Sequence, residues 1–337
     1  MTFHSSSDML KNETQSKKHF LIVGAGLSGL SLASVLLEQG QEVTILDKSR
    51  GLGGRMATRK TLGGGVIDHG AQYFSAKSPV FKDFLANMKN EGVVTKWTLA
   101  QRKYPRFIGT DGMKRIAQKM AENMPVHTAQ KVVRIEGKTV LTQSGHRFTF
   151  DELILTIPVP QALELLKESQ IFLEEEELQA LTKIEYDPCL AVLAVLSKPT
   201  SIPTGGIMLT DSPVAWLADN FQKGITTEPT LTLHASGDFS RTHLETVDLE
   251  EVGKQLLESV GTWVEPSNVL SFQVHRWRYS LARQRYPKPF MSLANGFIHL
   301  AGDAFGSGNG NVEGAFLSGY DLGNHLCDLS PRHHSSV

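Results

Sequence analysis

Residues 20–29 read FLIVGAGLSG, an apolar stretch with strand character that leads directly into a G-x-G-x-x-G turn. Gly24 permits the tight turn, Gly26 lets the backbone approach a pyrophosphate, and Gly29 lets the following helix pack closely on the strand. The first amide groups of that helix, at Leu27 and Ser28, would then bind the anion, because a helix N-terminus favours negative charge. This stretch predicts a phosphate-binding strand–turn–helix unit.

A second apolar run supplies the acidic residue that such a unit requires. It reads EVTIL at residues 42–46 and ends at Asp47. In dinucleotide-binding folds an acid at this place accepts hydrogen bonds from the ribose hydroxyls of adenosine. Strand, turn, helix, second strand and acid in this order predict an adenine dinucleotide site. The alternative is a glycine-rich turn without a ligand.

The next segment indicates which dinucleotide is bound. Residues 50–58 read RGLGGRMAT, a glycine-dense loop that carries Arg50 and Arg55. Bare backbone amides and a planar guanidinium offer a second surface for phosphate, where a nicotinamide dehydrogenase would continue into its next helix and strand. We therefore favour a flavin dinucleotide over the alternative of a flexible surface loop.

Composition argues against several classes of protein. The chain has 337 residues, 20% of them charged, and a net charge of −1, which gives no electrostatic footprint for nucleic acid or an anionic membrane. The sequence contains no apolar stretch near the ~20 residues that span a bilayer. Cys189 and Cys327 match no disulfide or metal-ligand spacing, so we expect a reducing, cytoplasmic location and no metal. Residues 1–18 are expected to form a disordered leader and residues 329–337 a frayed tail; oligomeric state is not indicated.

Four further segments carry motif-like sequences. They are GGRMATR and IDHGAQYF at residues 53–59 and 67–74, HRWRYS at residues 275–280, and FIHLAGDA followed by NVEGAFLSG at residues 297–304 and 311–319. Together with the dinucleotide unit, these segments resemble the FAD-dependent amine oxidase superfamily, and within it renalase and its bacterial relatives. The resemblance extends from residue 20 to about residue 327, so the chain is identified as a renalase-like member.

The resemblance implies an α/β fold. A Rossmann-type FAD-binding domain with an inserted β-meander is joined to a smaller α+β substrate domain, as in amine oxidases and p-hydroxybenzoate hydroxylase. We expect residues 19–76, 106–160 and 291–328 to form the discontinuous FAD-binding domain, and residues 77–105 and 161–290 the substrate domain. The sequence pattern predicts a strand over residues 97–107, a meander of four short strands between residues 131 and 156, and a strand at 297–301 that completes the first sheet.

The resemblance also implies a set of FAD contacts. We expect them at Gly24, Gly26, Leu27, Ser28, Gly29, Asp47, Lys48, Gly54, Arg55, Met56, Gly70, Ala71, Gln72, Val133, Gly302, Asp303, Asn311, Val312 and Glu313. Val133 would meet the adenine end, Asp303 the ribityl-phosphate region, and the helix starting at Val312 would direct its N-terminus toward the flavin pyrimidine ring, where its dipole favours negative charge. No cysteine occupies the position where covalent monoamine oxidases attach flavin, so FAD is expected to be non-covalent.

The substrate-contacting set is expected to comprise Gln72, Tyr73, His234, Arg276 and Trp277, with His275 and Tyr279 as further wall residues. Trp277 would stack on a pyridine ring, and Arg276 or Arg278 would hold a substrate phosphate. Alternation along a strand puts His275, Trp277 and Tyr279 on one face and both arginines on the other. The aromatic residues and the arginines therefore cannot all face the site. Purely structural roles for His234 and Trp277 stay open.

The chemistry is expected to differ from amine oxidation. Amine oxidases carry a lysine near flavin N5 on the strand that resembles residues 189–196, whereas this chain has Ala191 at that place. The resemblance to renalases implies oxidation of 2- or 6-dihydro isomers of NAD(P)H to NAD(P)+, with a hydride passing to flavin N5 and O2 reduced to H2O2. The partners would be a small dihydronicotinamide and O2. The alternatives are a flavin amine oxidase acting on a small amine and a non-catalytic FAD-binding protein.

Overall fold

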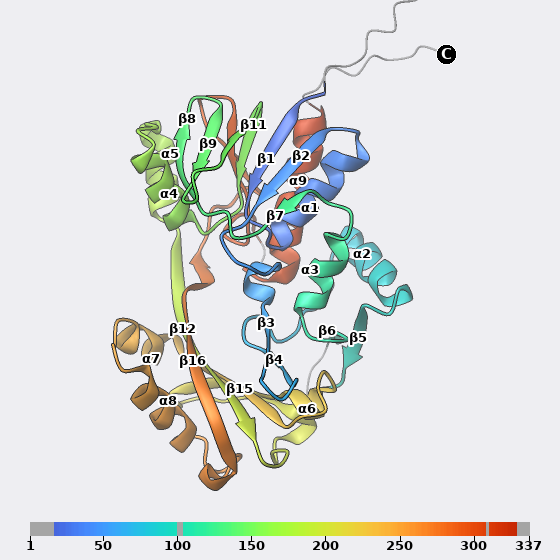
Figure 1. The fold of residues 1–337 in the computed structure, drawn as a ribbon, viewed down its shortest axis with the longest axis vertical. Coiled ribbons are helices and arrows are strands. Elements are labelled where there is room, and N and C mark those ends of the chain that lie inside the picture. Colours follow the sequence, from blue (N-terminus) through green and yellow to red (C-terminus); the bar gives the residue numbers. More distant parts are fainter. Residues whose placement is uncertain (1–16, 100–103, 308–309, 329–337) are drawn as a thin grey trace, which may run out of the picture.

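The first sheet is a six-stranded, mostly parallel sheet built around the dinucleotide unit (Figure 1). The computed structural model describes residues 17–99, 104–307 and 310–328. The strand order is β17–β18–β11–β1–β2–β7, and only β17 runs antiparallel to its neighbour. The strands are β1 (His19–Val23), β2 (Glu42–Leu46), β7 (Val126–His127), β11 (Glu152–Leu155), β17 (Met291–Ser292) and β18 (Ile298–Leu300). The expected strand near residues 297–301 therefore joins the first sheet, as predicted.

Both faces of this sheet are buried, because the side chains of β1 are apolar on each side. Phe20 and Ile22 pack toward helices α1 (Leu27–Glu38), α3 (Lys114–Met120) and α9 (Val312–Asp328). Leu21 and Val23 pack toward the other face, which carries α4 (Val159–Glu168), α5 (Glu175–Thr182) and the meander β8 (Val132–Glu136), β9 (Thr139–Thr142) and β10 (Arg147–Thr149). A sheet covered on both faces explains the continuous apolar run in the sequence.

Helices α1 and α9 lie in very close contact although they come from opposite ends of the described chain (Figure 1). Gly319 makes this approach possible, since a Cβ atom there would lie 2.0 Å from the carbonyl oxygen of Ser28. Any larger side chain at this position would push the helices apart. Helices α1 and α9 are therefore parts of one packed layer.

The second sheet has five strands in the order β13–β14–β15–β12–β16. They are β12 (Glu185–Leu196), β13 (Gly206–Met208), β14 (Val214–Asp219), β15 (Thr230–Ala235) and β16 (Val269–Gln284). Leu190, Val192 and Leu233 point to one face and pack under α7 (Gly237–His243) and α8 (Leu249–Glu258). The opposite face is turned toward the two-stranded sheet β3 (Thr58–Lys60) and β4 (Val66–Asp68), which lies between the two larger sheets (Figure 1).

Two expectations about strands are wrong. Residues 97–107 do not form one strand: β5 (Val94–Trp97) and β6 (Arg106–Gly109) are an antiparallel pair, with Trp97 opposite Arg106. The fourth short strand, β11, pairs with β1 in the first sheet and not with the meander. In both cases the sequence correctly indicated extended backbone but not the strand with which it pairs, because pairing depends on residues far away in the sequence. The remaining helices are α2 (Pro79–Asn90) and α6 (Asn220–Lys223), and short 3-10 turns lie at Gly54–Met56, Pro203–Gly205 and Pro266–Asn268.

Candidate functional site

The carboxyl ends of four parallel strands meet at one edge of the first sheet. Gly24 follows β1, Asp47 follows β2, Thr156 follows β11 and Gly302 follows β18. The Thr156 hydroxyl donates to the Gly24 carbonyl over 3.0 Å, which joins the turns on either side of the point where the strand order reverses. Open α/β sheets bind ligands at such an edge. The dinucleotide motif and the terminal motif therefore reach one site.

The start of α1 fits a pyrophosphate. Gly26 precedes the helix in extended conformation. Among the described residues, no side chain caps the helix and no atom lies within 4 Å of a Cβ atom placed on Gly26. Packing within the protein therefore does not require glycine here, and the space beside Gly26 is left for a ligand. Gly29 differs, because a Cβ atom there would lie 2.1 Å from the carbonyl oxygen of Gly24. Leu27 and Ser28 occupy the first helical turn, as expected of anion-binding amides.

Asp47, which is predicted to bind the ribose hydroxyls of adenosine, also holds the turn after β1. Its carboxylate accepts the backbone N–H of Ala25 over 2.8 Å and that of Ser49 over 2.7 Å. Val133 lies in an irregularity of β8 that interrupts pairing with β9. Beside this end of the site is a groove of about 410 Å³, lined by Lys48, Arg50, Ala129, Lys131, Gln143 and Ser144. The adenosine end of the predicted site is thus rich in lysine and arginine.

Two predicted FAD residues from distant motifs form an ion pair with each other. Arg55 donates to both carboxylate oxygens of Asp303, over 2.7 and 2.5 Å, and also to the carbonyl of Ser280 over 3.1 Å. Gly70 lies against this arginine, since a Cβ atom there would be 1.9 Å from the Arg55 carbonyl oxygen, and that oxygen accepts the N–H of Ala71. The loop 53–59, the segment 67–74 and the terminal motif therefore converge, and Gly54 and Met56 lie in the turn between them.

The side chains of Asn311 and Glu313, at the end of the terminal motif, form hydrogen bonds within the protein. Asn311 Oδ1 accepts the N–H of Gly314 over 2.9 Å, in the manner of a helix cap, and α9 begins at Val312. The Glu313 carboxylate accepts the backbone N–H groups of Lys77 and Ser78, over 3.0 and 2.7 Å. Glu313 thus ties α9 to the start of α2. Contacts of these three residues with FAD stay a prediction.

One face of the second sheet forms an aromatic wall, comprising His69, His234, His275 and Trp277. Strand register brings Ala191 opposite both His234 and His275, and Cys189 opposite Trp277. His69, directly after β4, stacks on Trp277 with ring centroids 5.3 Å apart and lies edge-on to His275 at 4.7 Å. The His69 carbonyl contacts His234 Nε2 at 3.2 Å and accepts the indole N–H of Trp277 over 2.8 Å. Sequence reasoning found three of these residues and missed His69, which lies inside the quoted motif IDHGAQYF.

The wall is uncharged near neutral pH. Burial lowers the pKa of His69 to about 3, with further lowering by His275 and Arg59, and burial lowers the pKa of His234 to about 4. Burial and the positive charge of Arg59 also lower the pKa of His275. Nδ1 of His69 is buried without a hydrogen-bond partner among the described residues. The wall therefore presents flat, neutral rings.

Acidification is expected to destabilise the protein through these histidines. The unfolded chain binds protons at His69 and His234 below about pH 6.5, whereas the folded chain does so only near pH 3 and 4. The free energy of unfolding therefore falls as the pH decreases from 6.5 to 4. Melting temperatures across this range should show a weaker pH dependence in His234→Asn than in the wild type. Equal dependence in both proteins would contradict the assignment.

The structure separates the other predicted substrate residues. The Arg276 guanidinium donates to the Thr246 carbonyl over 2.8 Å, and Arg278 pairs with Glu245, so both point away from Trp277. The expectation that Arg276 lines the same site as Trp277 is therefore wrong, for the reason that strand alternation gives. Tyr279 contacts Tyr186 with ring centroids 5.6 Å apart.

Gln72 and Tyr73 lie beside the wall on the segment that follows Gly70. Gln72 Nε2 donates to the carbonyls of Asp68 and Gly70, over 2.6 and 3.1 Å, and its Oε1 is buried without a partner in the described structure. Tyr73 packs edge-on against Trp216, with centroids 5.4 Å apart. Both residues are thus held by packing, and Gln72 keeps one unused acceptor.

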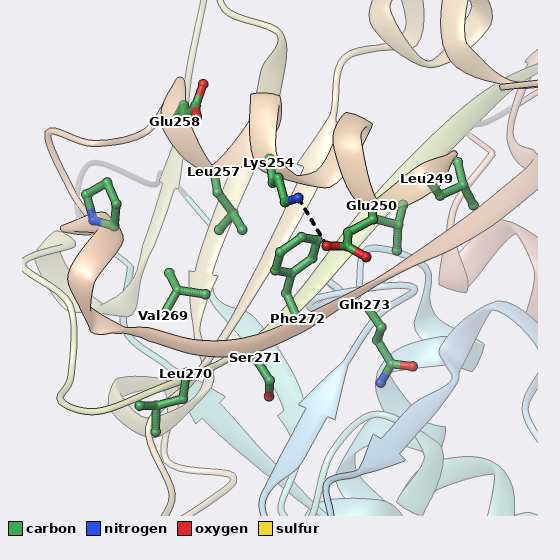
Figure 2. A pocket seen from close by; sticks show the side chains of 12 residues that line it. Leu249, Glu250, Lys254, Leu257, Glu258, Val269, Leu270, Ser271, Phe272 and Gln273 are labelled. Carbon is green, nitrogen blue, oxygen red and sulfur yellow. Dashed lines mark ion pairs between the residues drawn. The ribbon is translucent and has the colours of Figure 1, made fainter. Parts of the chain in front are cut away.

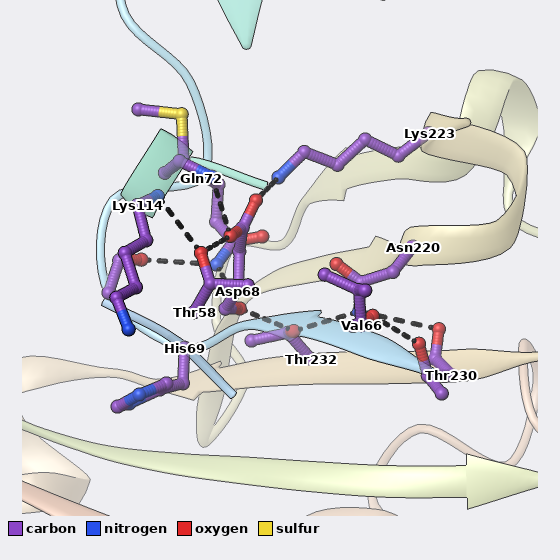
Figure 3. A network of polar contacts seen from close by, with 12 residues as sticks. Thr58, Val66, Asp68, His69, Gln72, Lys114, Asn220, Lys223, Thr230 and Thr232 are labelled. Atoms are coloured by element: carbon purple, nitrogen blue, oxygen red, sulfur yellow. Dashed lines mark hydrogen bonds and ion pairs between the residues drawn. The ribbon is translucent and has the colours of Figure 1, made fainter. Parts of the chain in front are cut away.

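A buried ion pair that the sequence did not reveal fixes this region (Figure 3). Lys223 Nζ lies 2.7 Å from Asp68 Oδ2, and both side chains are 0% exposed. The other carboxylate oxygen of Asp68 accepts the Thr58 hydroxyl over 2.5 Å and the backbone N–H of Met113 over 2.8 Å. The Asp68 carbonyl accepts the Thr232 hydroxyl over 2.7 Å. Asp68 therefore joins β3, β15, α6 and the residue that precedes α3. It lies directly before His69 in the chain.

A separate groove of about 590 Å³ lies between α8 and the start of β16 (Figure 2). Its lining includes Leu257, Phe272 and an exposed ion pair, Lys254–Glu250. This groove is on the face of the second sheet opposite the wall, and the sequence motifs do not reach it. We therefore place the functional site at the wall and the strand ends. Within the described residues no group of three or more His, Cys, Asp or Glu side chains is arranged to hold a metal ion.

Comparison with known families defines the class of protein. A family model described as flavin containing amine oxidoreductase matches residues 89–321, and one described as NAD(P)-binding Rossmann-like domain matches residues 22–88. The chain therefore belongs to the flavin containing amine oxidoreductase family. It is an FAD-dependent oxidoreductase, and the predicted fold class and cofactor are confirmed.

Within this family the chain is similar to renalase. Renalase of Mus musculus is 25% identical over 326 residues, which is 86% of this chain and 94% of that protein, and the renalase-like resemblance is confirmed. An L-amino-acid oxidase of Notechis scutatus scutatus is 36% identical over 75 residues, 22% of this chain and 14% of that oxidase. A structure of putrescine oxidase bound to putrescine shares the fold, with a TM-score of 0.70 at 15% identity over 93% of this chain and 99% of that one. In the described part of the chain, no helix has the length and apolar character needed to cross a membrane.

Proposed function

We propose that this protein oxidises the 2- or 6-dihydro isomers of NAD(P)H to NAD(P)+, with O2 as the electron acceptor and H2O2 as product. The observation that carries the proposal is the neutral aromatic wall, which has Ala191 at its centre in place of a lysine. Similarity to renalase over nearly the whole of both chains supports it. A flat ring surface suits a dihydropyridine, which loses a hydride to become an aromatic pyridinium and needs no base.

FAD fits the residues at the strand ends. The uncapped α1, the open space beside Gly26, and the Arg55–Asp303 pair would hold its phosphates and ribityl chain, and Asp47 its adenosine. When bound, FAD supplies a two-electron acceptor for the hydride and a route for those electrons to O2. Attachment would be non-covalent. Cys327 lies on α9, beyond the terminal motif, and burial raises the pKa of Cys189 to about 12, which keeps that thiol protonated.

The side chains of the wall would bind and orient the substrate. Trp277 and His275 are partly exposed and would offer their rings to a nicotinamide, and the buried His69 supports Trp277 by stacking on it. The hydrogen bonds from His234 and Trp277 to the His69 carbonyl hold this surface rigid. Orientation of this kind accelerates hydride transfer without a titrating group at the reacting carbon. We also propose a cytoplasmic location, which the sparse cysteine content supports.

The test mixes purified holoprotein anaerobically with borohydride-reduced NAD+, which contains the 2-, 4- and 6-dihydro isomers, and follows flavin absorbance by stopped flow. We expect rapid bleaching by the mixture, little bleaching by pure NADH, and H2O2 formation when O2 is readmitted. Putrescine and other simple amines are the comparison substrates. Bleaching by an amine alone would assign the protein to amine oxidation, and no bleaching by any of these compounds would favour a non-catalytic FAD-binding protein.

A further inference from the structure

The β3–β4 hairpin presents different residues on its two faces. Its antiparallel register sets Thr58 opposite Asp68 and Arg59 opposite Ile67. Thr58 and Asp68 point toward Lys223, as Figure 3 shows, and form the buried polar network. Ile67 points the other way and packs on Ala191, Leu193 and Trp277. Because residues opposite each other share a face, Arg59 extends along the wall side of the hairpin.

Arg59 reaches the edge of the wall. Its Nη1 donates to Gln273 Oε1 over 2.5 Å. Gln273 lies two residues before His275 on β16, so the two side chains share a face, and Figure 2 shows Gln273 directed away from α8 while Phe272 points toward it. Gln273 therefore holds the guanidinium at the outer end of the row formed by His275 and Trp277.

The charge of Arg59 acts on the wall without being neutralised. Its positive charge disfavours protonation of both His69 and His275, which places the guanidinium within electrostatic reach of both rings. Among the described residues no carboxylate lies within ion-pair distance of Arg59, and the side chain is solvent-exposed. Arg276 and Arg278 point to the other face of the sheet. In the described structure Arg59 thus adds a positive charge without a carboxylate partner at the edge of a wall of neutral rings.

We propose that Arg59, held by Gln273, binds the pyrophosphate of the dinucleotide substrate while the dihydronicotinamide ring lies on His275 and Trp277. This inference rests on the proposed function and names the residue that selects a phosphorylated substrate. The N–H groups of the guanidinium that do not contact Gln273 are suited to donate two parallel hydrogen bonds to phosphate oxygens. A cation at this position also disfavours an ammonium substrate, in keeping with the substrate class proposed above.

The first test compares substrates with and without phosphate. In Arg59→Gln, kcat/KM for the 2- and 6-dihydro dinucleotides is expected to fall about tenfold or more, mainly through KM, since one charge-assisted contact is lost. The corresponding dihydronicotinamide ribosides, which lack phosphate, should react equally with variant and wild type. Lys60→Gln is the matched control, because Lys60 is exposed on the opposite face of the hairpin and its charge change is the same. An equal loss for dinucleotide and riboside in Arg59→Gln would overturn the proposal.

The second test does not depend on turnover. Titration calorimetry measures the binding of NAD+ and of inorganic pyrophosphate to the oxidised holoprotein. We expect binding to weaken about tenfold in Arg59→Gln. The loss should be smaller in Arg59→Lys, because lysine keeps the positive charge but lacks the two parallel N–H groups of a guanidinium. Flavin content and melting temperature establish that each variant is folded. Unchanged binding in Arg59→Gln would overturn the anion site. If binding changes as expected but no dihydronicotinamide reduces the flavin of the wild type, the proposed function fails while the anion site stands.

Discussion

Gly26→Val is expected to yield a folded protein that has lost its flavin. The backbone at Gly26 has φ −78° and ψ 176°, which any residue adopts, and a Cβ atom there meets no atom of the described residues within 4 Å. The chain itself therefore accepts a side chain at this position. The added isopropyl group would occupy the space in which the pyrophosphate must approach the first turn of α1.

The measurement is the flavin-to-protein absorbance ratio after purification, followed by titration of the apoprotein with FAD. We expect the affinity of Gly26→Val for FAD to fall by well over tenfold. Fewer than about one in ten molecules should then retain flavin after purification. Gly29→Val is the contrasting variant: its side chain would clash with the Gly24 carbonyl and destabilise the fold as well. If Gly26→Val purifies with a full complement of flavin, the assigned phosphate position is incorrect.

Asp68→Asn is expected to destabilise the protein by roughly 3–5 kcal/mol, because it leaves the Lys223 ammonium buried without a counter-charge. Both side chains are 0% exposed, and water cannot replace the lost carboxylate. The asparagine would also weaken the acceptor for the Thr58 hydroxyl and the N–H of Met113.

Urea denaturation of flavin-saturated protein measures this loss. The double variant Asp68→Asn with Lys223→Met should recover much of it, because the unpaired charge is removed together with its partner. Lys254→Gln is the control, since the Lys254–Glu250 pair is exposed at the surface and its loss should leave the denaturation midpoint unchanged (Figure 2). A midpoint in Asp68→Asn equal to that of the wild type would show that the buried pair does not support the fold.

The dinucleotide-binding unit of the first sheet could be predicted because its information is local. One strand–helix–strand unit contains the glycines at 24, 26 and 29 and the acid at 47. Each of these residues is explained by a contact within that unit or by the approach of a dinucleotide. The alternation of His275, Arg276, Trp277 and Arg278 likewise follows from the geometry of a single strand, and the structure decided only which set faces the hairpin.

The rest of the site depends on contacts between distant residues. Lys223 is one of many lysines in the sequence, and only the fold brings it to Asp68, 155 residues away. Arg59 belongs to a motif that was identified in the sequence. Its hydrogen bond to Gln273, however, forms only because the hairpin lies against the second sheet. The error at residues 97–107 has the same origin, since a β-propensity pattern does not specify where a strand turns back on its partner.

The Arg55–Asp303 ion pair joins two parts of the proposed FAD site that are synthesised at different times. The two residues are 248 positions apart, and α9, which follows Asp303, packs on α1. At about 5–20 residues per second, a ribosome needs roughly 12 to 50 seconds to synthesise the intervening chain. Throughout that interval the nascent N-terminal unit exposes an apolar helix face and half of a phosphate site. Full binding of FAD at the proposed site therefore follows synthesis of the segment around Asp303 and the packing of α9 on α1.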